Sequence, residues 1–143
     1  MKFAYTLVYV PDVAASLAFF DAAFGLKTRF LHESGGYGEV ETGAGGTALA
    51  FVSHEVAGGV LPQGYRAAND GAQPLGMEIG FTVDDVPAAF ARAVAAGAQA
   101  LLAPVEKPWG RRCRMCAART APSSNCARRC RERRLPGARS EES

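Results

Sequence analysis

The chain has 143 residues, of which 48% are hydrophobic and 21% charged, and its formal net charge is +2. That length suits one domain or two small packed halves, and the hydrophobic share is near the globular average, which excludes disorder of the whole chain. No run approaches the roughly 20 apolar residues that a membrane-spanning helix needs. The stretch that precedes Asp12 is too short for a signal peptide, so we expect a cytoplasmic protein.

Charge and residue type change abruptly near Gly110. Residues 1–110 have a net charge of −5, whereas residues 111–143 hold ten Arg against three Glu, a net charge of +7. All four cysteines lie in this second segment, which has no Phe, Tyr, Trp, Val or Ile. A segment so charged and so poor in apolar residues cannot offset its own ordering entropy, so 111–143 is predicted to be a disordered tail.

The chain before that break begins with the pattern of a strand, a helix and three short strands. β-forming residues predict a strand over 4–10, and Asp12 is placed to cap a helix that ends before Gly25. The apolar stripe of this helix consists of Val13, Leu17, Phe20 and Phe24. Gly-rich turns then separate strands predicted at residues 27–33, 37–42 and 47–54. The stretch 55–75, rich in Gly, Pro and Asn, is predicted to be a connecting loop.

The same pattern starts again after this loop. Residues 77–83 predict a strand, and Asp85, which lies 73 positions after Asp12, predicts a second helix that ends at Gly97. Its apolar stripe consists of Val86, Phe90 and Val94. A further strand is predicted at 98–105. The sequence therefore predicts an α+β fold of two βαβββ modules that form a curved mixed sheet around a cavity. The first module covers 1–54, and the second, at 76–110, is incomplete.

Alternation along the strands separates a face that packs against the helix from a face that borders the cavity. In the second module, Ile79, Phe81 and Val83 suit the helix face. The residues predicted to bind a small organic molecule in the cavity are Tyr5, Leu7, Tyr9, Ala50, Val52, Glu78 and Thr82, with Trp109 at the rim.

Three segments resemble the glyoxalase/bleomycin-resistance/extradiol-dioxygenase superfamily, also called vicinal oxygen chelate proteins. They are YVPDVAASLAFFDAAFGL, its second copy EIGFTVDDVPAAFARAVAAGA, and KPWG at Lys107–Gly110, which resembles the start of the seventh strand in many members. The resemblance covers about residues 3–110 and implies the fold and a homodimer. It leaves the chemistry open, because this fold hosts isomerases, ring-cleaving dioxygenases, epoxide-opening transferases and non-catalytic drug-binding proteins.

The resemblance also locates the positions of a possible metal site. Members that use a metal place one His or Glu on the first and fourth strand of each module, and these positions fall on Tyr5, Ala50, Glu78 and a place near 124–125. Because Ala50 has no ligand atom, we expect no functional metal and no other cofactor, with a divalent ion as the alternative. Glu78 is the best candidate for a catalytic group. His54, at a strand end, is predicted to lie at the surface.

These observations predict a protein of the vicinal-oxygen-chelate type that binds a small organic molecule without a functional metal site. The first alternative is an enzyme, a glyoxalase-like lyase or a dioxygenase-like protein. The second alternative is a tail that binds zinc or nucleic acid. Nine residues separate the pairs Cys113–Cys116 and Cys126–Cys130, fewer than the usual spacing of about 15–20, and aromatic platforms for single-stranded nucleic acid are absent from the tail.

A third interpretation of the tail is a frameshift after about Gly110. When the codons are read from their third base, the junction of Met115 and Cys116 must encode Val, and that of Asn125 and Cys126 must encode Leu. With GC-rich codons the whole segment reads KPWGQTVPYVRGPDGTLVELCAPV. This string holds a strand, a Pro-Asp-Gly turn and a second strand, which are the two strands that the second module lacks. We therefore predict that the tail is a frameshift product.

Overall fold

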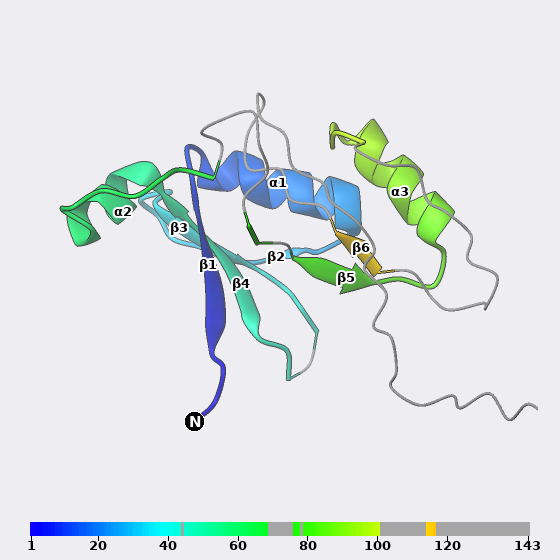
Figure 1. Cartoon of the computed structure of the whole chain (residues 1–143), viewed down its shortest axis with the longest axis horizontal. Coiled ribbons are helices and arrows are strands. Elements are labelled where there is room, and N and C mark those ends of the chain that lie inside the picture. Colours follow the sequence, from blue (N-terminus) through cyan, green and yellow to red (C-terminus); the bar gives the residue numbers. More distant parts are fainter. Residues whose placement is uncertain (44, 69–75, 78, 101–113, 117–143) are drawn as a thin grey trace, which may run out of the picture.

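The computed structural model describes residues 1–43, 45–68, 76–77 and 79–100, together with the backbone of residues 114–116 (Figure 1). Its elements in chain order are β1 (Tyr5–Val10), α1 (Val13–Phe24), β2 (Thr28–Leu31), β3 (Tyr37–Val40), β4 (Ala48–Ser53), α2 (His54–Val60), β5 (Gly80–Thr82), α3 (Val86–Ala95) and β6 (Arg114–Cys116). The fold is of the α+β class, as predicted. No helix within the described ranges is long and apolar enough to cross a membrane.

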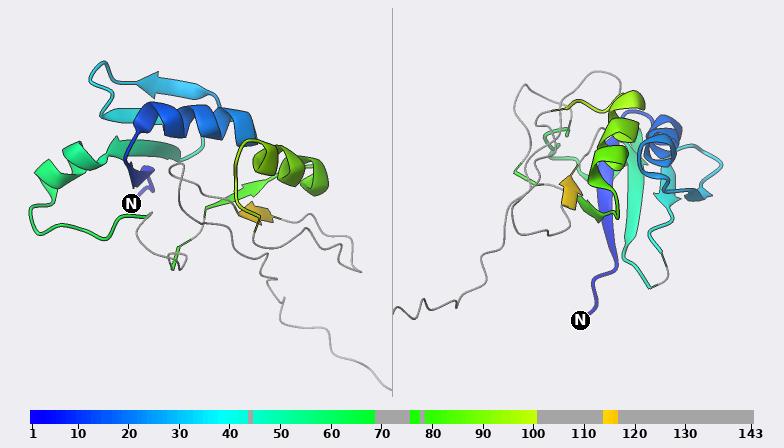
Figure 2. Two further views of the ribbon diagram at one scale, coloured as in Figure 1. Left: turned by 90° about the horizontal axis from the view of Figure 1, so that it is seen from above. Right: turned by 90° about the vertical axis from the view of Figure 1, so that its right-hand side faces the viewer.

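The first module forms one mixed sheet with the strand order β1-β4-β3-β2. β1 runs parallel to β4, while β3 runs antiparallel to both of its neighbours. α1 covers one face of this sheet, and α3 lies beside α1 (Figure 2). This arrangement is the βαβββ unit that the sequence predicted for residues 1–54, with strand ends that differ by a few residues.

Local signals fix both ends of α1. The Asp12 side chain accepts a hydrogen bond of 2.8 Å from the amide of Ala15, which satisfies one of the free donors of the first turn. At the other end Gly25 adopts a left-handed conformation with φ of 71°, and its amide donates to the carbonyl of Asp21 at 2.8 Å. The predicted cap and stop of this helix are confirmed.

The main core lies between α1 and the sheet. Phe20 is fully buried, and its ring centroid lies 4.8 Å from that of Phe51 on β4. The other buried members of this cluster are Val8, Val10, Val13, Leu17, Val40 and Leu49. Gly38 on β3 lets α1 approach closely, because a Cβ atom there would lie 2.8 Å from Leu17. The predicted helix stripe is confirmed at its first three positions, while Phe24 is only half-buried.

The second helix packs differently from the prediction. Asp85 caps α3 through a hydrogen bond of 2.9 Å from the amide of Ala88, as expected. The buried residues of α3 are Ala89 and Ala93, however, and they pack with Ala23 of α1. The predicted stripe is only half-buried at its start, and Val94 is exposed. Small alanines let the two helices approach more closely than a valine or phenylalanine stripe would.

Three further predictions need correction. The start of the predicted loop 55–75 is helical, because Ser53 caps α2 through its hydroxyl and the amide of Val56. Residues 98–100 are not in a strand, although they belong to the predicted strand 98–105, whose other residues lie outside the described ranges. Within the tail that was predicted to be disordered, Arg114–Cys116 form β6, which pairs antiparallel with β5. The free edge of β5 offers backbone groups that such a strand satisfies.

Candidate functional site

The face of the first sheet that points away from α1, here called the open face, carries five of the predicted binding residues. Residues of the opposite parity, such as Val8 and Val10, are buried under α1. Side chains alternate along a strand, so the five lie together on the other face. They are Tyr5, Leu7 and Tyr9 of β1 with Ala50 and Val52 of β4. The structure therefore places these five residues on one face of the sheet.

The strand register extends the open face onto β3. Ala50 lies opposite Leu7 on one side and opposite Glu39 on the other. Val52 likewise lies between Tyr9 and Tyr37. Sequence analysis did not identify Glu39 or Tyr37, although alternation along β3 places both on one face.

A chain of polar contacts runs across the outer part of the open face. The Tyr37 hydroxyl donates a hydrogen bond of 2.5 Å to Glu39 Oε1. The other carboxylate oxygen, Oε2, is buried and accepts no hydrogen bond in the described part of the chain, but it forms an ion pair of 3.1 Å with Arg29 Nε. The Glu39 side chain is only 15% exposed, against 60% for Arg29. Arg29 therefore compensates a carboxylate that is largely removed from water.

The phenol of Tyr37 stays protonated well into the alkaline range. Burial, and then the hydrogen bond to Glu39, raise the pKa of Tyr37 from 10.0 to about 12. Both effects disfavour the phenolate, since it would be poorly solvated and would lie beside a carboxylate. At neutral pH this side chain is therefore a hydrogen-bond donor held in a fixed direction.

An aromatic cluster closes the other end of the open face. Tyr65, from the segment after α2, packs on Tyr9 with ring centroids 4.8 Å apart. Its hydroxyl lies 2.6 Å from Nδ1 of His54, which is half-buried rather than at the surface as predicted. With Tyr5 and Tyr37, this places all four tyrosines of the chain on or against the open face. No local signal pointed to Tyr65, because its partner Tyr9 is far away in the sequence.

Of the remaining predicted site residues, the structure describes only Thr82, which is not on this face. Glu78 and Trp109 lie outside the described residues. Thr82 lines a cavity of about 530 Å³ whose wall also includes Thr6, Phe24, Phe81 and Arg92. None of the five predicted binding residues of the open face belongs to that wall, so the described residues of the predicted cavity lie in two separate places.

The described donor atoms do not fit the metal site that the resemblance implies. Ala50 has no ligand atom, and its neighbours across the strands are Leu7 and Glu39. Both carboxylate oxygens of Glu39 are already engaged by Tyr37 and Arg29. Among the residues that the structure describes, no three His, Cys, Asp or Glu side chains gather as a metal site requires. The residues at this site instead offer an apolar surface with one fixed hydroxyl.

Comparison with known proteins agrees with this architecture. The sequence profile of the Glyoxalase/Bleomycin resistance protein/Dioxygenase superfamily matches residues 2–120. A family enzyme of that description from Burkholderia phytofirmans PsJN is 23% identical, with a TM-score of 0.60 over 81% of this chain and 87% of that chain. A glyoxalase-related enzyme from Fulvimarina pelagi is 22% identical, with a TM-score of 0.60 over 87% and 83%.

A third solved structure, a glyoxalase/bleomycin resistance protein/dioxygenase from Nocardioides, is 18% identical, with a TM-score of 0.57 over 86% of this chain and 79% of that chain. At such identities the likeness shows the fold and leaves the ligand open. No curated protein matches the chain.

Proposed function

Because the chain belongs to the Glyoxalase/Bleomycin resistance protein/Dioxygenase superfamily, we propose that it binds a small organic molecule on the open face, without a metal at the positions of Tyr5 and Ala50. This proposal goes beyond family membership, since proteins of one fold differ widely in their chemistry.

The observation that carries the proposal is the exposure of apolar surface beside a fixed polar group. Tyr5 and Leu7 are 57% and 37% exposed, while Ala50 and Val52 on the neighbouring strand β4 are buried. A ligand that covered Tyr5 and Leu7 would remove apolar surface from water at about 25 cal/mol per Å². The Tyr37–Glu39–Arg29 contacts border this surface and can orient a polar group of the ligand.

The enzymatic alternatives depend on groups that the described chain does not supply at this face. A metal-dependent lyase or dioxygenase of this fold needs several ligands, and Ala50 supplies none. Glu78, the best candidate for a catalytic group, lies outside the described residues. Added zinc or nickel is therefore expected to leave the melting temperature unchanged. Saturable binding of one equivalent, lost in Glu78→Ala, would instead support the enzymatic alternative.

A screen of small neutral fragments by ligand-observed NMR tests the proposal. Some fragments should bind the wild-type chain but give no binding signal with Leu7→Lys, because this variant places a charge in the apolar surface. Val94→Lys is the matched control, since Val94 is 40% exposed but lies on α3, beside α1. If every fragment that binds the wild type binds Leu7→Lys equally well, the open face is not the binding site.

A further inference from the structure

A second ligand site, separate from the open face, is suggested by the cavity between the two modules. The cavity lies where α1 ends, between the β1–β4 pair and β5, and its volume is about 530 Å³. Ligand sites in proteins commonly have volumes of about 300–1,000 Å³ with mostly apolar walls and a few polar groups. None of the five predicted binding residues of the open face contributes to it, so this inference is independent of the function proposed above.

The wall of the cavity is apolar and partly aromatic. Phe24 and Phe81 face each other with ring centroids 5.1 Å apart and planes inclined by 30°. The other large apolar residues of the wall are Phe3, Leu26, Leu49, Ile79 and Val83. Several threonines supply the polar part, but one of them, Thr42, already donates its hydroxyl proton to the carbonyl of Thr47 at 2.9 Å. The wall therefore suits a ligand with an apolar body.

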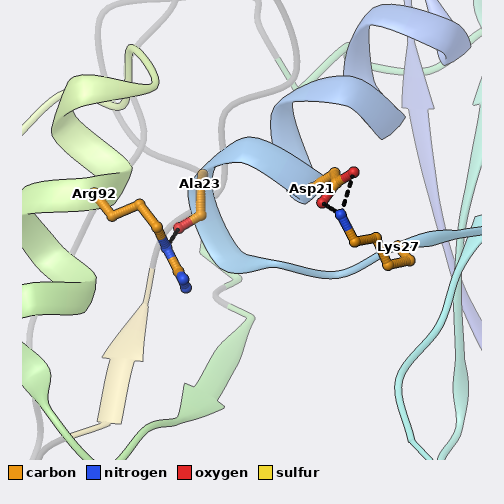
Figure 3. Close-up of polar contacts among 4 residues, drawn as sticks. All are labelled: Asp21, Ala23, Lys27 and Arg92. Carbon is orange, nitrogen blue, oxygen red and sulfur yellow. Dashed lines mark hydrogen bonds and ion pairs between the residues drawn. The ribbon is translucent and has the colours of Figure 1, made fainter.

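Arg92 is the one charged residue among the described residues that line the cavity. Its Nε donates a hydrogen bond of 2.9 Å to the carbonyl of Ala23, which holds the guanidinium against the end of α1 (Figure 3). The two terminal nitrogens of Arg92, Nη1 and Nη2, lie next to Gly25. If residue 25 had a Cβ atom, that atom would be 3.9 Å from Nη1 and 4.0 Å from Nη2. A glycine at this position leaves the space open. The planar fork of a guanidinium matches a carboxylate.

The C-terminal end of a helix ordinarily repels an anion, because its free carbonyls carry partial negative charge. Here the carbonyls of Phe20 and Asp21 accept hydrogen bonds from Leu26 and Gly25, and that of Ala23 accepts from Arg92. The full positive charge of the guanidinium then exceeds the residual negative charge of the helix end. The surroundings of Arg92 therefore favour a single anionic group.

We propose that this cavity binds a monocarboxylate with an apolar or aromatic body, with Arg92 as the partner of the carboxylate and Phe24 and Phe81 against the body. The probe is 2-naphthoate, and naphthalene-2-carboxamide is its neutral match in size and shape. Calorimetry of the full chain should show binding of both, with 2-naphthoate about tenfold tighter. That ratio lies at the low end for a charge-assisted hydrogen bond, because Arg92 is exposed to solvent.

Three variants locate the binding. Arg92→Met should reduce the affinity for 2-naphthoate to that for the amide and leave the amide unchanged. Thr82→Trp should fill the cavity and abolish binding of both probes, whereas Tyr5→Phe on the open face should affect neither. Equal affinity of the wild-type chain for the two probes, no binding of either probe, or binding that survives Thr82→Trp would overturn the proposal, and the first two outcomes require no variant to fold.

Discussion

Arg92 and Ala23 join the two modules through a hydrogen bond of 2.9 Å between residues 69 positions apart (Figure 3). The same end of α1 carries a second contact, the ion pair of 2.7 Å between Lys27 and Asp21. The two contacts differ in kind. The first fixes α3 against α1, whereas the second is local and its lysine is 69% exposed.

Removal of these two contacts should have different consequences. Arg92→Met is expected to lower the free energy of unfolding by about 1 kcal/mol, because it removes a charge-assisted hydrogen bond between modules. Lys27→Met is expected to cost less than about 0.5 kcal/mol, since exposed ion pairs contribute little. Urea denaturation of both variants measures the difference. Equal losses would mean that the Arg92 bond does not couple the modules.

The contact between α1 and α3 should tolerate no increase in side-chain size. Ala93 is 2% exposed and packs with Ala23, which is fully buried. Ala93→Leu is therefore expected to cost about 1–3 kcal/mol of stability through overpacking. Ala91→Leu, on the exposed side of the same helix, is the control and should be close to neutral, because alanine and leucine have similar helix propensities. A neutral Ala93→Leu would place α3 farther from α1 than described here.

The raised pKa of Tyr37 predicts an alkaline loss of stability. The folded pKa, about 12, exceeds the ordinary value of 10.0, so the neutral phenol is favoured by folding. This contribution is complete below pH 10 and is lost as the pH rises through about 12. Ultraviolet difference titration should show a tyrosine component near pH 12 that is absent in Tyr37→Phe. A Tyr37→Phe chain with an unchanged titration curve would contradict the contact with Glu39.

We propose that the tail, residues 111–143, is translated out of frame. β1 pairs parallel with β4, whereas β5 pairs antiparallel with β6. A second module that repeated the first would place a parallel strand beside β5 at about residues 121–126, and the shifted reading has TLVEL at 122–126. β6 stands instead at the position of PYV in that reading.

The frame-restored chain, which ends in KPWGQTVPYVRGPDGTLVELCAPV, should unfold at a higher temperature than the chain as it stands. The added hairpin buries about five large side chains at roughly 1.5–3 kcal/mol each, a sum comparable to the stability of a whole domain. Melting both chains side by side measures this. Cooperative unfolding at equal temperatures would show that the tail already stabilises the second module, and the DNA sequence around codons 108–112 tests the frame directly.

Features encoded over a few residues could be predicted from the sequence, while contacts between distant segments could not. Asp12 and Asp85 cap their helices because the acceptor and its amide lie three positions apart. The Glu39–Arg29 ion pair escaped prediction because it joins two strands across an irregular register. Ala93 was missed for a similar reason: an alanine gives no hydrophobic signal of its own, and its burial depends on Ala23.

The helix α2 was not predicted, because its sequence contains signals both against and for a helix. Gly58 and Gly59 disfavour a helix by about 1 kcal/mol each, and they led to the prediction of a loop. Ser53 provides a cap and Ala57 is buried, which together stabilise the short helix. Burial against the rest of the fold is not visible in a local pattern, so composition alone favoured the wrong assignment.

The most direct test of binding at the open face is NMR of the chain with its tyrosine rings labelled with ¹³C. All four tyrosines lie on or against that face, so a ligand there must change their signals. A second sample with labelled phenylalanine reports on Phe24 and Phe81 in the other cavity. With the neutral fragments whose binding is lost in Leu7→Lys, we expect shifts of the tyrosine rings and none of Phe24 or Phe81. If no fragment that binds the chain moves a tyrosine signal, the proposed function is contradicted.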